Sequence, residues 1–272
     1  MLALVGCGST DNTSTEIDVA TDNQPVSEEV VSDESSPDDT DAAVESEAQD
    51  ETEEASVCTT LTYIGHASVK IVAKDGTELL IDPNYEEWDW KAENPDIVIV
   101  THGHGDHTPN YNLTMSDECT FINYKDAHTG DTYESYDVGP YHIEAVPAAN
   151  ENHDIKYCVG YIVTVDGVSV YHAGDTSKLD SMSELADKNI DYAMYPIDGV
   201  YNMDAVEATE VAGMVGAKNN IPIHELNEDG QPAKEDNFTP EGKLVLSYGE
   251  TIVIANNKSE RYKIKRKYKN RN

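Results

Sequence analysis

Basic residues are missing from the first quarter of this sequence, in which no Lys or Arg occurs before Lys70. Over the whole chain, 18 Lys and Arg stand against 53 Asp and Glu, which gives a formal net charge of -35. Phosphate backbones are bound by positive surfaces, so we expect no nucleic-acid partner for the body of the protein. An acidic surface of this kind mainly favours solubility.

Long apolar runs are also missing, and cysteines are few. A membrane-spanning helix needs roughly 20 consecutive apolar residues, and the sequence contains no run of that length, so none is predicted. Besides Cys7, the cysteines are Cys58, Cys119 and Cys158, and three cysteines allow at most one internal disulfide. Their spacing favours no pair and is not that of metal ligands, so we expect packing residues or one bridge.

The segment 9–55 contains no basic and no aromatic residue and is rich in Asp, Glu, Ser and Thr. Such a segment cannot bury enough apolar surface to offset the entropy of ordering it. Residues 8–57 are therefore predicted to be a disordered acidic linker, which its like charges keep extended. An acidic tail that serves only solubility is the alternative.

The first seven residues, Met-Leu-Ala-Leu-Val-Gly-Cys, end in a sequence that resembles a bacterial lipobox, Leu4-Val5-Gly6-Cys7. In a lipobox the cysteine is lipidated and becomes the first residue of the mature protein. A secretory signal also has a basic region and a longer apolar region, so residues 1–7 correspond to a truncated lipoprotein signal. The alternative is a chance cysteine in a short apolar start. We expect a protein outside the cytoplasm, lipid-anchored to a bacterial cell membrane, with the acidic linker holding the domain away.

Residues 58–257 have the pattern of a folded domain, and residues 258–272 form a separate basic tail. Strands are predicted at 60–64, 68–73, 78–81, 97–100, 120–124, 141–146, 159–165, 168–171, 193–197 and 251–255. Helices are predicted at 181–187 and 205–215, the second with Asp204 as its N-cap. Asp166-Gly167 predicts a two-residue hairpin turn. Many strands, followed by alternating helices and strands, fit two packed sheets with helices outside.

A histidine-rich loop carries the strongest chemical signal. Thr-His-Gly-His-Gly-Asp-His at 101–107 follows the apolar run 97–100, which is predicted to be a buried strand. His102 and His104 are two residues apart, so in extended backbone both imidazoles leave on the same side and can close on one ion.

The second part of this loop can serve a second ion. Asp106 and His107 follow the turn, so they can face another point a few ångströms away. Gly103 and Gly105 are expected to supply the backbone freedom that the tight loop needs.

Three residues downstream complete the pattern. His153, Asp175 and His224 each lie where a predicted strand gives way to a loop, which is where folds of this kind place functional residues. A solvated histidine-rich loop is the alternative, and the ordered occurrence of these three residues argues against it.

The combination resembles the signature of the metallo-β-lactamase superfamily: HxHxDH at 102–107, a later lone His, a Gly-Asp-Thr and a final His. The segments 63–68, 81–83, 171–176 and 195–203 resemble a branch that includes ascorbate-6-phosphate lactonase and related metal-dependent hydrolases. The resemblance covers about residues 61–254 and is more specific for fold and metal site than for substrate. It implies an α+β fold, an αββα sandwich of two mixed sheets flanked by helices.

The resemblance also implies a ligand set for two metal ions. It places three histidines on one ion, two histidines and an aspartate on the other, and one aspartate between them: His102, His104 and His153; His107, His224 and Asp106; and Asp175. Imidazole-rich sites with few carboxylates suit Zn²⁺, so two zinc ions are expected. Ions about 3.5–4 Å apart can hold a bridging hydroxide that attacks a carbonyl or phosphoryl centre. Asp106 and Asp175 are the expected catalytic residues.

We therefore expect a zinc-dependent hydrolase of a small ester, lactone, amide or phosphodiester. One alternative is a nuclease of the same fold, which the acidic body and the export signal disfavour. Another is a non-catalytic surface lipoprotein that binds metal or a ligand, which the complete ligand set disfavours. His66 and His172 are expected either to hydrogen-bond behind the ligands or to pack in the core. His128 and His142 are expected at the surface.

Overall fold

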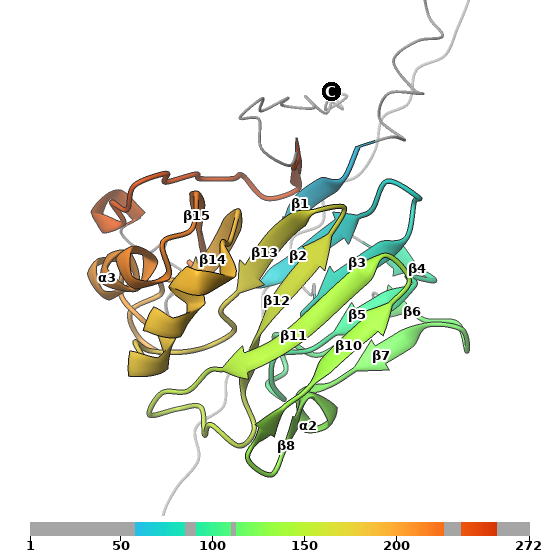
Figure 1. The fold of residues 1–272 in the computed structure, drawn as a ribbon, viewed down its shortest axis with the longest axis horizontal. Helices are drawn as coiled ribbons and strands as arrows, with labels where there is room; N and C mark the ends of the chain where they lie inside the picture. Colours follow the sequence, from blue (N-terminus) through green and yellow to red (C-terminus); the bar gives the residue numbers. More distant parts are fainter. Residues whose placement is uncertain (1–57, 85–90, 110–112, 226–234, 255–272) are drawn as a thin grey trace, which may run out of the picture. The chain divides into compact units, whose positions relative to one another are not determined.

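Two six-stranded sheets lie face to face in this computed structural model (Figure 1). It describes residues 58–84, 91–109, 113–225 and 235–254, all of which belong to one unit, residues 46–272. The predicted lipobox at 1–7, acidic linker at 8–57 and basic tail at 258–272 lie outside the described residues. No helix in the described part of the chain is long and apolar enough to cross a membrane.

The first sheet has the strand order β16-β1-β2-β3-β5-β7. Its strands are β1 (Thr60–Gly65), β2 (Ser68–Val72), β3 (Glu78–Ile81), β5 (Ile97–Ile99), β7 (Thr120–Ile122) and β16 (Glu250–Val253). β16, β1, β2 and β3 pair antiparallel, whereas β3, β5 and β7 pair parallel. The sheet is therefore mixed.

The second sheet repeats this plan with the order β10-β11-β12-β13-β14-β15. Its strands are β10 (Ser135–Val138), β11 (Tyr141–Pro147), β12 (Val159–Val165), β13 (Val168–His172), β14 (Tyr192–Pro196) and β15 (Asn219–Ile223). β10 to β13 pair antiparallel, and β13, β14 and β15 pair parallel. Two further two-stranded ribbons join β4 (Ala92–Glu93) to β6 (Leu113–Thr114), and β8 (His128–Thr129) to β9 (Thr132–Tyr133).

The main core fills the space between the sheets, because both inner faces carry Val, Ile, Leu and Tyr side chains. Tyr63, Val69, Ile97, Tyr161 and Val170 are among its fully buried members. A second apolar cluster lies under α3 (Ala205–Val215) and the 3₁₀ helix η1 (Asp180–Lys188), on the outer face of the second sheet. The predicted sandwich of two mixed sheets with flanking helices is confirmed, although the fold is mostly β.

Local signals explain several element boundaries. The Asp204 carboxylate accepts hydrogen bonds from the amides of Val206 and Glu207 at the start of α3, as predicted, a cap worth about 1 kcal/mol. Asp166 and Gly167 join β12 to β13 with φ of 51° and 79°, which matches the predicted hairpin turn.

Other elements differ from the sequence prediction. The strand predicted at 120–124 ends at Ile122, because the Asn123 side chain accepts from the amides of Lys125 and Asp126 and starts α2 (Tyr124–Ala127). The short β4, β6, β8 and β9, strand β10 and η2 (Glu235–Asn237) were not predicted. Most are two or three residues long, too short for a periodic pattern to reveal.

Candidate metal centre

Parallel strands of both sheets deliver the candidate ligands to one edge. The loop 101–107 follows β5, Asp175 follows β13 and His224 follows β15, while His153 lies in the loop between β11 and β12. The carboxyl ends of parallel strands meet at the same edge, so side chains distant in sequence converge there. Val159 donates its amide to the carbonyl oxygen of Thr101 at 2.9 Å, which ties the two sheets together beside the site.

The three histidines predicted for the first ion lie together. The Nε2 atom of His153 is 3.1 Å from Nδ1 of His104. The ring centroid of His102 lies 4.6 Å from that of His104 and 4.7 Å from that of His153. Their nitrogen atoms can all reach one point, with ligand atoms within 4.8 Å of one another.

Asp175 occupies the centre. Its carboxylate oxygens lie 3.3 Å from His153 Nε2, 3.4 Å from His107 Nε2, 3.5 Å from His224 Nε2 and 3.8 Å from His102 Nε2. The side chain is 4% exposed. It therefore faces members of both predicted ligand sets, the position expected of a carboxylate shared by two ions.

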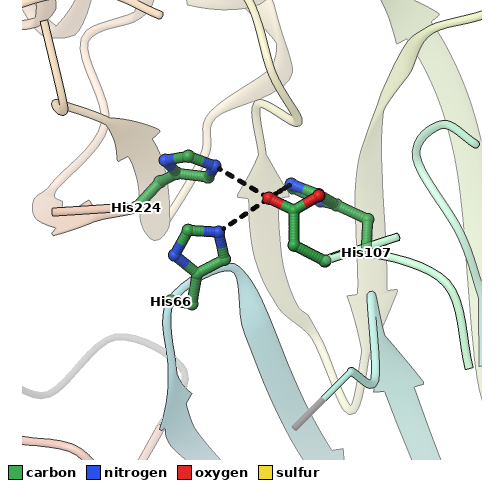
Figure 2. Close-up of side chains that lie close together, drawn as sticks. His66, His107 and His224 are labelled. Atoms are coloured by element: carbon green, nitrogen blue, oxygen red, sulfur yellow. Dashed lines mark hydrogen bonds and ion pairs between the residues drawn. The ribbon is translucent and has the colours of Figure 1, made fainter. Parts of the chain in front are cut away.

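The residues predicted for the second ion also converge, with one addition. Asp106 Oδ2 lies 3.7 Å from Nε2 of both His107 and His224. His66, from the turn between β1 and β2, joins this group, with its Nε2 3.1 Å from the same oxygen. Figure 2 shows the rings of His66, His107 and His224 directed toward one point from three different parts of the chain.

Asp82 contacts the candidate ligand His107 directly and the candidate ligand His102 through Thr101. Its buried carboxylate lies 2.8 Å from Nδ1 of His107 and accepts from the amide and hydroxyl of Thr101, each at 2.7 Å. Because the Thr101 hydroxyl donates to Asp82, its oxygen can accept from Nδ1 of His102, 3.0 Å away. These partners place the proton on Nδ1 of both rings and leave Nε2 free for an ion.

Two further side chains lie beside Nδ1 of the remaining buried candidate ligands, His224 and His153. Nδ1 of His224 lies 3.0 Å from the Asp198 carboxylate, and Nδ1 of His153 lies 2.8 Å from the side-chain oxygen of Asn150. Asp198 also accepts from the amides of Val200 at 2.8 Å and Tyr201 at 2.6 Å. The second nitrogen of each ring is thus oriented by the fold.

The free nitrogens test whether these residues fit a metal. The Nε2 atoms of His102, His107 and His224 are buried and have no hydrogen-bond partner in the described part of the chain. Buried polar atoms without partners are costly, and three of them facing two carboxylates form a donor set suited to a cation. The residues present therefore fit a metal centre.

The ionisation of the site follows from its burial and its charge pairs. Burial, with the nearby His107, lowers the pKa of His102 to about 3. Burial would raise the pKa of Asp175, but four histidines around it, His224 first, lower it well below its usual range. The pKa of His224 is raised despite its burial, chiefly by Asp175. Histidine binds a metal in its neutral form, so metal affinity at this site should fall as the pH falls.

The expected role of the loop glycines was wrong. Neither Gly103 nor Gly105 has a positive φ, so no left-handed backbone is needed there. A Cβ on Gly103 would lie 2.6 Å from the Tyr124 hydroxyl, so this glycine provides space, and a Cβ on Gly105 would meet nothing within 4 Å. Gly174, next to Asp175, is the glycine whose backbone is left-handed, with φ of 64°.

The remaining cysteines and histidines take other roles. Cys58, Cys119 and Cys158 are all free, so no bridge joins them. His172 is buried and bonds the backbone at Ala67 and Gly174. His142 is partly exposed, as expected. His128 is likewise partly exposed, and it stacks on Tyr133 with 4.2 Å between ring centroids.

The residues that orient the ligands were not predicted from the sequence. Thr101, Asp82, Asn150 and Asp198 each touch a candidate ligand through its second nitrogen. A usable signal was present, because Asp82 and Asp198 follow buried strands just as the ligands do. The sequence alone does not show which histidine Asp82 or Asp198 contacts.

Comparison with known proteins agrees with this geometry. A family model described as the beta-lactamase superfamily domain matches residues 60–224. A UPF0173 metal-dependent hydrolase of Pyrococcus furiosus is 32% identical over 219 residues, which cover 71% of this chain and 95% of that protein.

Solved structures share the architecture. A protein of Parabacteroides distasonis superposes with a TM-score of 0.59 at 27% identity, over 69% of this chain and 92% of that one. Igni18, a metallo hydrolase of the archaeon Ignicoccus hospitalis, has a TM-score of 0.59 at 21% identity, over 73% of this chain and 99% of that chain. The second likeness concerns the fold alone.

Proposed function

The chain belongs to the metallo-β-lactamase superfamily and is a metal-dependent hydrolase of that fold, and we propose that it uses two zinc ions to hydrolyse a small ester, lactone, amide or phosphodiester. One observation carries the proposal: Asp175 lies between two groups of imidazole nitrogens, within 3.8 Å of a member of each. Imidazole-rich sets of this kind suit Zn²⁺.

The protein side chains would hold and orient the reacting groups. His102, His104 and His153 would bind one ion, and Asp106, His107 and His224 the other, with Asp175 shared. When bound, two such ions would polarise the oxygen under attack and lower the pKa of a water molecule, so that water could act as the nucleophile near neutral pH.

Asp106 and Asp175 differ in what they can do for the substrate. The Asp175 side chain is 4% exposed, so it can orient groups but cannot exchange protons readily with solvent. The Asp106 side chain is 51% exposed and lies at the open side of the site. We therefore assign Asp106 the role of orienting the attacking water and receiving its proton. No Ser or Cys nucleophile is required.

The test is a hydrolysis screen with the full chain loaded with zinc, across lactone, carboxyl ester, amide, β-lactam and phosphodiester substrates. We expect about two zinc ions per chain by elemental analysis, and turnover that chelation abolishes and zinc restores. Asp175→Ala in the same screen is the matched inactive control. A zinc content near zero after loading, or turnover that survives chelation, would refute the proposal.

A further inference from the structure

His66 occupies an unusual backbone position beside the candidate metal centre. It lies in the tight turn between β1 and β2 with φ of 48°, a left-handed conformation that residues other than glycine rarely adopt. Its carbonyl oxygen accepts from the Tyr63 hydroxyl at 3.0 Å and from the His224 amide at 2.8 Å. Strained backbone held in place by its surroundings is often found at functional sites.

The side chain of His66 is directed at the candidate second metal point. Its ring centroid is 3.8 Å from that of His224, and Figure 2 shows both rings turned toward the same place. Its Nε2 lies 3.1 Å from Oδ2 of Asp106. A carboxylate can only accept, so Nε2 of His66 carries the proton and donates.

The ring nitrogens of His66 have different partners from those of the neighbouring His107 and His224. His107 and His224 each have a buried carboxylate on Nδ1, Asp82 at 2.8 Å and Asp198 at 3.0 Å, which leaves Nε2 free to bind. No carboxylate lies on Nδ1 of His66 among the described residues, and its Nε2 is already used for donation. This arrangement suits a hydrogen-bond donor better than a ligand.

Asp106 needs such a donor. Its side chain is 51% exposed, so packing does little to hold it. The other nitrogens near its Oδ2 within the described ranges are Nε2 of His107 and of His224, each 3.7 Å away, and both are proposed ligands. An ion bound by those histidines would leave His66 as the partner of Asp106.

We propose that His66 is a positioning residue that fixes the Asp106 carboxylate at the second metal point by a hydrogen bond from Nε2, and so sets the affinity of that point for its ion. This inference rests on the proposed function, because it requires two metal points. It concerns metal affinity rather than turnover, so no substrate is needed to test it.

The experiment is a Co²⁺ titration of the metal-free full chain, followed by visible absorption and calorimetry. His66→Phe keeps a ring that can stack on His224 but cannot donate. We expect it to weaken the second binding event about 10–100-fold, as loss of an outer partner does, and to leave the first unchanged. His66→Gln, which keeps an N–H donor, should restore most of the affinity.

A double-mutant cycle separates positioning from direct binding. If His66 acts through Asp106, His66→Phe should have no further effect on the second affinity in an Asp106→Ala background. A full effect of His66→Phe in that background would show direct action on the ion and would overturn the inference.

A matched histidine variant and a check of the fold serve as controls for this titration. His142→Phe removes a histidine from another His–Asp pair, with Asp137 at 2.7 Å, and should leave both affinities unchanged. Circular dichroism and thermal melting of the metal-free variants check the fold. Two native affinities in His66→Phe, or equal losses in His66→Phe and His66→Gln, would overturn the inference alone. A native chain that binds a single Co²⁺ would overturn the two-metal proposal, and this inference with it.

Discussion

Asp175 is a carboxylate that faces both groups of candidate ligands, at 3.3 Å from His153 Nε2 and 3.5 Å from His224 Nε2. Asp175→Ala should therefore remove both ions. His224→Ala should mainly weaken the second ion, because the first retains His102, His104 and His153. Each loss of turnover should exceed the roughly 10–100-fold cost of losing an outer partner.

Elemental analysis, circular dichroism and turnover measure these effects. Asp106→Asn should keep the fold but lose the charge at the open side of the site. His142→Ala, at a partly exposed histidine away from the site, is the control and should change nothing. Two retained zinc ions and near-normal turnover in Asp175→Ala would contradict the shared role of this carboxylate.

His172 provides a pH-dependence with a defined sign. It is fully buried, donates from Nε2 to the Ala67 carbonyl at 2.8 Å and accepts at Nδ1 from the Gly174 amide at 3.2 Å, so the folded state needs the neutral ring. Burial lowers its pKa below the 6.5 of the unfolded chain. The unfolded state then binds the proton more tightly. This contribution to stability is present above pH 6.5 and is lost as the pH falls toward the folded pKa.

Chemical unfolding of the native chain and of His172→Gln, between pH 5 and 8, measures this contribution. Glutamine cannot titrate, so the difference in unfolding free energy between the two chains should narrow below about pH 6.5. Comparison with the variant cancels the titration of the other histidines. A difference that stays constant with pH would show that His172 does not titrate on unfolding.

The convergence of the seven candidate side chains was predictable at this scale, because His, Asp and Gly occur in a spacing that matches a known signature. Asp82 and Asp198 were not predictable as partners of His107 and His224. Their roles depend on contacts between residues 25 and 26 positions apart, which arise only when strands from one sheet are placed side by side.

At the scale of elements, the end of β13 constrains the position of Asp175. Gly174 precedes Asp175 with φ of 64°, and a Cβ there would lie 2.6 Å from the Val159 carbonyl oxygen and 3.2 Å from Thr101 Cβ. Gly174→Ala should cost about 2 kcal/mol or more, because it adds left-handed strain to a clash with backbone. It should also displace Asp175 and lower the zinc content.

Gly105→Ala is the matched control, because no atom lies within 4 Å of its added methyl and its φ is ordinary. Its effect on the unfolding free energy should stay within about 0.5 kcal/mol. Thermal melting and elemental analysis of both variants make the comparison. Equal stability of the two variants would show that the β13 end can relax around a side chain.

Predictions of strands and helices succeeded where the element is long and largely buried or begins at a clear turn or cap. β12 (Val159–Val165) and α3 (Ala205–Val215) have the predicted bounds. β10 (Ser135–Val138) was missed because Ser and Asp alternate with Tyr and Val in only four residues at a sheet edge, which weakens the apolar pattern. No order of strands within the sheets was predicted, because periodicity along the sequence does not say which strands pair.

At the scale of the whole molecule, the acidic segment and the folded domain are predicted to be independent. β1 begins at Thr60 and pairs with β16, so the described sheet is complete without residues 1–57. A chain that starts at Val57 should melt at the same temperature as the full chain, within error, because the acidic segment offers no apolar surface to the core. Calorimetry of both chains with equal zinc content measures this, and a large drop would mean that the segment packs on the domain.

The last prediction concerns where the protein resides. Leu4-Val5-Gly6-Cys7 resembles a lipobox and is followed by an acidic stretch without basic residues, so we propose a lipid anchor at Cys7 and a domain outside the cytoplasm. One acyl chain gives only marginal membrane binding, so stable anchoring requires more than one chain on the cysteine. Labelling with a radioactive fatty acid, in cells that express the chain from its full reading frame, should mark the native protein and leave Cys7→Ser unlabelled. Cys58→Ser, which alters a free cysteine of the domain, is the control and should label like the native chain. Equal labelling of Cys7→Ser would place the anchor elsewhere, and no labelling of either chain would assign the acidic segment to solubility alone.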